Sequence, residues 1–334
     1  LVFFMVTQQV LSLAETIVNK GNVFGIDRKV LQVYFGESLI NDDEPSLLVD
    51  LDPYITLGGF IETFLRSLIR QELHLDERNV NLAYLNFSEN IKKFESEILN
   101  STKRYIDEAN SLGNALRKLG YKLRFLISER TDGIDIYLLG RTELLRPHVS
   151  QRINTWLSEG ISKILVVSPF EYAMYKNRFL PQHGIQNIQL EFLPDLFEAF
   201  KGTPAMPDML EVALLEPYEA PIETLPLSIR ETILANIDRI KVALKRIKNL
   251  TVKVDRVRDC PFSYEQVWLL NPLVSVNVAA SILSDLSDLD AIITLRTSTA
   301  SILRVAAEIS EVDINIYDYI EVLSRAIIEG SPVE

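Results

Sequence analysis

The sequence predicts an α/β protein made of two similar lobes, each a mainly parallel sheet flanked by helices. Short apolar runs rich in β-branched residues alternate with longer stretches of helical periodicity along most of the chain. A unit of strand, turn, helix, strand and helix occurs once in each half. Between the halves, residues 201–207 (KGTPAMP) hold one Gly and two Pro, as segments that join domains often do. We therefore expect one lobe over residues 1–203 and a second over residues 204–334.

The first half is expected to contain five helices and five strands. Helical periodicity predicts helices at residues 11–18, 59–73, 90–116, 143–159 and 170–179. Compact β-rich runs predict strands at residues 30–35, 80–87, 121–127, 163–167 and 188–192. The alternation implies parallel strands joined by helical crossovers.

The second half is expected to repeat this plan. We predict strands at residues 212–215, 250–257, 291–295 and 314–317, and helices at residues 229–247, 276–286, 298–309 and 319–328. KILVVSPFEYAMYKNRF in the first half is similar to DAIITLRTSTASILRVA in the second, and this similarity predicts an internal duplication. Ser168 and Arg296 then hold the same place just after a buried strand, where parallel sheets bind ligands.

Composition excludes several classes of function. The net charge of −12 argues against nucleic acid as a partner, because phosphate backbones are bound by clustered Lys and Arg. The single cysteine, Cys260, excludes a disulfide framework and a thiol-held zinc site. The apolar opening LVFFMVTQQVLSLA is too short to span a bilayer and is expected to begin a buried helix. We expect a cytoplasmic location, with any membrane contact made through a partner.

Three sequence fragments then suggest a family. They are GNVFGIDR at residues 21–28, VYFGE at residues 33–37, and the duplicated ILVVSPFEY and AIITLRTST. In this order they resemble the cysteine-rich CCG-domain proteins, which include the B and D subunits of heterodisulfide reductase and the iron–sulfur subunit of glycolate oxidase. The resemblance covers most of the chain apart from an apparent insertion around residues 47–102.

The resemblance implies where cluster ligands would lie, and cysteine is absent from all but one of these positions. Asp132 lies as far before Ser168 as Cys260 lies before Arg296, which supports the alignment of the two halves. The former ligand positions are Glu37, Thr131, Asp132, Ser168, Glu171, Tyr218, Cys260, Arg296 and Thr299. Because iron–sulfur clusters are held by several thiolates, we expect no cluster and no other cofactor.

The leading hypothesis is a cluster-free structural or regulatory subunit, without independent catalytic activity, that binds iron–sulfur or flavin redox subunits. An alternative is a small-molecule or cation-binding protein, or an enzyme, that reuses the vacated pocket. Glu37, Asp132 and Glu171 could bind a hard cation there, and Arg296 an anion. Polar pairs that simply close the pocket remain the simpler interpretation. A third hypothesis is a redox enzyme whose cluster comes from a partner.

Overall fold

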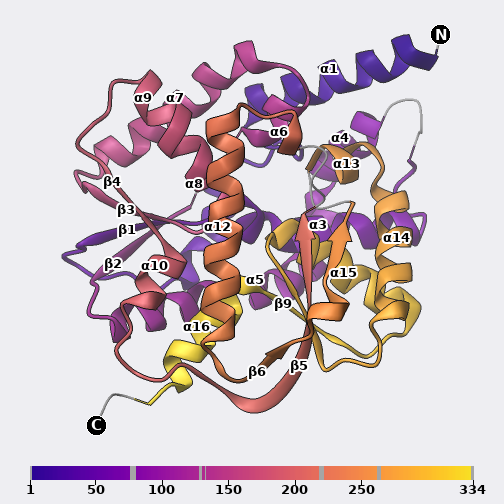
Figure 1. Ribbon diagram of the computed structural model, residues 1–334. Helices are drawn as coiled ribbons and strands as arrows, with labels where there is room; N and C mark the ends of the chain where they lie inside the picture. The colour runs from indigo at the N-terminus through magenta and orange to yellow at the C-terminus, as the bar shows by residue number, and fades with distance from the viewer. Residues whose placement is uncertain are drawn as a thin grey trace.

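Two separate parallel sheets form the framework of the protein. The computed structural model describes residues 2–75, 80–127, 130–131, 133–217, 222–261 and 265–331. The first sheet contains β1 (Leu47–Asp50), β2 (Leu123–Leu126), β3 (Lys163–Val166) and β4 (Gln189–Phe192). The second contains β5 (Ala205–Pro217), β6 (Lys248–Val252), β7 (Arg258–Cys260), β8 (Ala291–Thr294) and β9 (Asn315–Asp318). Figure 1 shows the sheets as two groups of strands, with α12 (Leu227–Lys245) crossing in front between them. The predicted fold class is confirmed.

The two sheets have the same topology. Their strand orders are β2-β1-β3-β4 and β6-β5-β8-β9, while β7 pairs with the end of β5. In both, the first strand of the lobe is central, the second lies on one side, and the third and fourth lie on the other. All these pairs are parallel. The shared order supports the predicted duplication, with β3 equivalent to β8 and β4 to β9.

Helices cover the sheets and fill the space between them. In the first half they are α1 (Val2–Lys20), α2 (Arg28–Tyr34), α3 (Pro53–Ile69), α4 (Val80–Glu89), α5 (Glu95–Lys118), α6 (Ile134–Leu138), α7 (Leu145–Ser158), α8 (Pro169–Met174), α9 (Leu180–Gln182) and α10 (Leu193–Glu198). In the second half, α12 is followed by α13 (Glu265–Leu270), α14 (Pro272–Asp285), α15 (Thr297–Ser310) and α16 (Tyr319–Glu329). Short 3-10 segments lie at Gly36–Ser38, Ile91–Phe94, Thr142–Leu144 and Val254–Arg256, and a π-helical turn at Tyr175–Phe179 follows α8.

The halves are joined through α3 and α5. These helices pack against each other and against α15 and α16 of the second half. Two adjacent glycines in α3 permit the close packing, because a Cβ on Gly58 would lie 2.2 Å from the Tyr105 ring of α5. A Cβ on Gly59 would lie 2.1 Å from Oγ1 of Thr102. Almost all of α3 is buried, so it belongs to the core shared by both lobes.

Two predicted strands in the first half are helices. Residues 30–35 fall mostly in α2, whose first turn is capped by Asp27 accepting a hydrogen bond from the Val30 amide. Residues 80–87 form most of α4 and bury Val80, Tyr84 and Phe87 on one face. Both predictions were wrong because a short apolar run fits a strand and one turn of a buried helix equally well, and capping and packing decide between them.

The segment predicted as an insertion supplies the centre of the first sheet. β1 lies between β2 and β3, with all four of its residues buried, and α3 follows directly. Part of the stretch predicted as an insertion, β1 and α3, therefore belongs to the framework of the protein. Within the described residues, none of the helices is both long enough and apolar enough to cross a membrane.

Candidate functional site

The carboxyl ends of the two sheets meet at a junction between the lobes. The Tyr319 hydroxyl, at the start of α16, donates a hydrogen bond to the carbonyl oxygen of Val167, which follows β3. The guanidinium carbon of Arg296, which follows β8, lies 4.3 Å from the centroid of the Phe170 ring in α8. We call these residues, together with Thr297 and Asp318, the inter-lobe junction. It brings the two positions marked by Ser168 and Arg296 to the same region of the molecule.

Helix starts supply most of the polar side chains around this junction. Ser168 caps α8, and its Oγ accepts a hydrogen bond of 3.3 Å from the Glu171 amide. Asp52 caps α3 and Asp318 caps α16 in the same way, through bonds of 2.8 and 2.9 Å to Tyr54 and Ile320. Such caps satisfy amide groups that have no partner inside the helix. The local role of Ser168, Asp52 and Asp318 is therefore structural.

A buried ion-pair cluster fills the carboxyl edge of the first sheet. Arg152 of α7 donates from Nε to Oδ2 of Asp50 over 2.9 Å, and its Nη2 also pairs with a carboxylate oxygen of Glu171. Trp156 donates to the same Asp50 oxygen over 3.0 Å. The side chains of Asp50 and Glu171 are 0% exposed and that of Arg152 is 2% exposed. Burial raises the pKa of Asp50, although the neighbouring Arg152 acts to lower it.

The GNVFG segment packs against the position that the resemblance assigned to the CCG triplet. Asn22 organises the segment, since its Oδ1 accepts from the Phe24 and Ile26 amides at 3.1 and 3.2 Å. The Thr131 amide donates to the carbonyl of Gly21 over 3.0 Å. His148 of α7 donates from Nε2 to the Thr131 carbonyl, and burial lowers the pKa of His148 to about 4. His148 is therefore a neutral core residue.

A small cavity remains beside this cluster, at the end of β2. Its volume is about 170 Å³. Three arginines line it, namely Arg28 at the start of α2, Arg130 and Arg152. Arg130 is fixed in part by a hydrogen bond of 3.1 Å from Nη1 to the carbonyl of Val18. The lining is thus basic, and none of the former ligand positions is part of it.

The carboxylates proposed as cation ligands are in different environments. Glu37 is exposed, in the 3-10 turn after α2, whereas Glu171 is fully buried and paired with Arg152. Asp132 lies outside the described residues. Among the residues that are described, no group of three His, Cys, Asp or Glu side chains is arranged to hold a metal ion.

In the second half, the described former ligand positions are buried. Cys260 is 0% exposed and lies at the end of β7, paired in the sheet with Pro217. Arg296 and Thr299 are 4% and 2% exposed. Tyr218 falls outside the described part of the chain. Cys260 is thus a core side chain next to the carboxyl end of β5.

Three residues of the buried ion-pair cluster were not among those predicted from the sequence. Asp50, Arg152 and Trp156 were missed, although each carried a local signal. Asp50 is a charged residue directly after the apolar run LLV, and Arg152 and Trp156 lie four residues apart on one helix face. A charge at the end of an apolar strand is unusual enough to mark a buried partner.

Asp318 is the titratable group at the centre of the junction. Its Oδ2 accepts a hydrogen bond of 2.9 Å from the Thr297 hydroxyl. Burial raises the pKa of Asp318 to about 7, and the nearby Asp52 carboxylate acts in the same direction. Ionisation of Asp318 therefore falls near neutral pH.

Replacing Arg152 by Met should strongly destabilise the fold. Two buried carboxylates would lose their cation, which typically costs about 3–5 kcal/mol. Arg124→Met is the matched control, because Arg124 forms a more exposed pair with Glu159, and such pairs contribute at most about 1 kcal/mol. Urea unfolding of both variants measures the difference. Equal losses for the two variants would contradict the role assigned to Arg152.

Asp318→Asn should change how stability depends on pH. The folded protein holds a proton on Asp318 that the unfolded chain releases above about pH 4, so wild-type stability should fall as pH rises from about 4 to about 7. Asparagine removes this fall. The difference in unfolding free energy between wild type and Asp318→Asn should be measured at both ends of this pH range. From about pH 4 to about pH 7 it should change against wild type by more than about 1.4 kcal/mol, which corresponds to one pKa unit.

His148→Gln serves as a control of opposite sign. His148 is neutral in the folded protein down to a pKa of about 4 and protonated in the unfolded chain below about pH 6.5. Wild type should therefore gain stability relative to His148→Gln as pH rises through this window. Parallel pH curves for wild type and Asp318→Asn would show that Asp318 does not titrate as described.

Comparisons with known proteins leave the family of this chain open. No protein-family model matches it, and a search of curated proteins gave no match. Among solved structures, the chain is similar to an aspartate racemase homologue from Pyrococcus horikoshii, with 12% sequence identity and a TM-score of 0.31. The alignment covers 86% of this chain and 98% of the homologue. A similarity this low supports no conclusion about activity.

Proposed function

We propose that this chain is a cluster-free relative of the iron–sulfur subunits of the CCG-domain family, and that it acts as a structural or regulatory subunit of a redox assembly. The observation that carries the proposal is that core side chains fill most of the former ligand positions that are described. Glu171, Ser168, Arg296 and Thr299 are at most 4% exposed. Their roles are ion pairing, helix capping and packing.

An iron–sulfur cluster does not fit this set of side chains. Iron in such clusters is held by several thiolates, and the sequence has one cysteine. Glu171 is already paired with Arg152, and the cation of Arg296 in the second half lies over the Phe170 ring of the first half. A positive side chain at a ligand position repels iron. The chemistry of the family is therefore replaced by interactions that stabilise the two-lobed framework.

The proposed role predicts a stable protein partner. A tagged chain recovered from its native host should copurify with an iron–sulfur or flavin protein in a fixed ratio, while an unrelated protein with the same tag should not. Recovery of the chain without such a partner would contradict the assignment.

The isolated chain should also contain no stoichiometric iron or sulfide, and Cys260→Ala should match wild type in both. Iron and sulfide present in wild type and lost in Cys260→Ala would overturn the cluster-free assignment.

A second candidate function is supported by the cavity lined by Arg28, Arg130 and Arg152. Guanidinium groups bind phosphate and carboxylate through paired hydrogen bonds, and ligands of parallel sheets bind at this edge. Arg28, Arg130 and Arg152 together bring three guanidinium groups to the lining of this cavity. The cavity is large enough only for a small anionic group.

Inorganic phosphate should therefore raise the melting temperature of the protein. Arg28→Met should weaken phosphate binding about tenfold, since a charge-assisted hydrogen bond contributes roughly 1.5–3 kcal/mol. Lys29→Met is the control, because Lys29 is the exposed neighbour of Arg28 and does not line the cavity. Calorimetric titration measures the binding constants. Equal phosphate affinity in wild type and Arg28→Met would exclude this candidate.

A further inference from the structure

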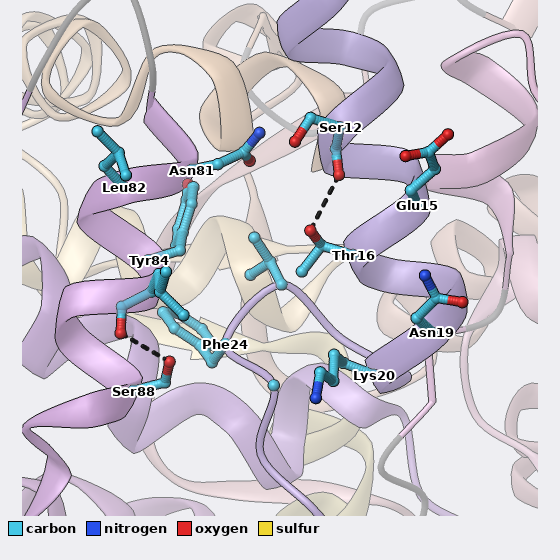
Figure 2. Close-up of a pocket in the computed structure, with 13 residues that line it drawn as sticks. Ser12, Glu15, Thr16, Asn19, Lys20, Phe24, Asn81, Leu82, Tyr84 and Ser88 are labelled. Carbon is cyan, nitrogen blue, oxygen red and sulfur yellow. Dashed lines mark hydrogen bonds between the residues drawn. The ribbon is translucent and has the colours of Figure 1, made fainter.

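A second cavity lies between α1 and α4, on another part of the first lobe. Its volume is about 500 Å³, within the range of roughly 300–1,000 Å³ typical of small-molecule sites. Figure 2 shows one wall formed by α1, the other by α4, and Phe24 of the connecting segment below. None of the former ligand positions lines it. This cavity is therefore distinct from the inter-lobe junction.

Asn81 on α4 supplies the most informative group in this wall. Neither its side-chain oxygen nor its nitrogen has a hydrogen-bond partner within the described structure, and both atoms are shielded from solvent. Buried amide groups are rarely left in this state, because each lost hydrogen bond costs about 1–3 kcal/mol. Figure 2 shows the amide turned toward α1, in the direction of Ser12. A rotation of this side chain would present a donor and an acceptor side by side to a molecule in the cavity.

Aromatic side chains form the apolar part of the lining. Phe24 and Tyr84 have ring centroids 5.6 Å apart in an edge-to-face arrangement. Tyr84 is held in place by a hydrogen bond of 2.9 Å from its hydroxyl to the carbonyl of Leu269. Both rings are 1% exposed and make this part of the lining rigid, while the exposed side chains of Leu82 and Leu85 offer the cavity apolar surface next to the Asn81 amide.

We propose that this cavity binds a small planar heterocycle that carries a hydrogen-bond donor beside an acceptor, as the edge of an adenine base does. An asparagine amide matches this edge through a pair of hydrogen bonds. The apolar side chains of Leu82 and Leu85 contact the ring, and the Asn81 amide selects its edge. This inference is independent of the role proposed for the junction.

Calorimetric titration with free adenine tests the proposal. Adenine should bind wild type at one site per chain, and purine, which lacks the amino donor, should bind at least about fivefold more weakly. Asn81→Ala should weaken adenine binding by at least this factor and purine binding by less, because purine keeps only the ring-nitrogen acceptor. Asn86→Ala is the matched control, since Asn86 is exposed on the same helix and does not line the cavity.

Folding of the variant is checked separately. Because the Asn81 amide makes no hydrogen bond in the described structure, Asn81→Ala without ligand should melt at or above the temperature of wild type. If this variant unfolds early, Asn81→Leu, which keeps the volume, is used in its place. The absence of adenine binding to wild type, or equal binding by wild type and the folded Asn81 variant, would overturn the proposal.

Discussion

The fold depends on the burial of one arginine. A guanidinium that is taken out of water loses many kcal/mol of hydration, and only close opposite charges and hydrogen bonds offset that loss. Arg152 has these from Asp50, at the end of the central strand, and from Glu171, in the first turn of α8. The side chain thereby ties β1, α7 and α8 together. Since the position of α8 also sets that of Phe170, the same cluster helps to place the surface on which the second lobe packs.

The two halves share a strand order but fill equivalent positions by different interactions. Glu171 in the first half corresponds to Thr299 in the second, and only Glu171 takes part in a buried ion pair. Ser168 corresponds to Arg296, and Ser168 caps its helix through its side chain whereas Arg296 does not. Such differences are what we expect if a common site lost its function and each copy was then stabilised independently. They also explain why the apolar pattern of the two halves is similar while the polar positions do not match.

The sequence predicted β3 and β8, which are buried on both faces, but missed β1 and failed where short runs were ambiguous. β3 and β8 are continuous apolar runs within one or two residues of their expected bounds, because parallel strands covered by helices need such runs. α2 was predicted as a strand because the run VLQVYF is too short to show helical periodicity and is rich in β-branched and aromatic residues. The N-cap provided by Asp27 favours the helix instead. β1 was missed because it is only four residues long and ends in a charged residue, Asp50, which is unusual in a buried strand. Its burial is possible because Arg152 pairs with it.

The candidate site was the least predictable part, for a physical reason. Helix and strand periodicity describe neighbours in sequence, whereas the partners of Arg152 lie on either side of it in the chain, on β1 and α8. A carboxylate such as Glu171 can hold a cation, bind a ligand or pair with an arginine, and only the distance to its neighbours decides. Once Arg152 is within bonding distance, hard-cation binding at Glu171 would require breaking a buried ion pair. The pairing of Glu171 with Arg152 therefore follows from packing and could not have been derived from the spacing of the acidic residues.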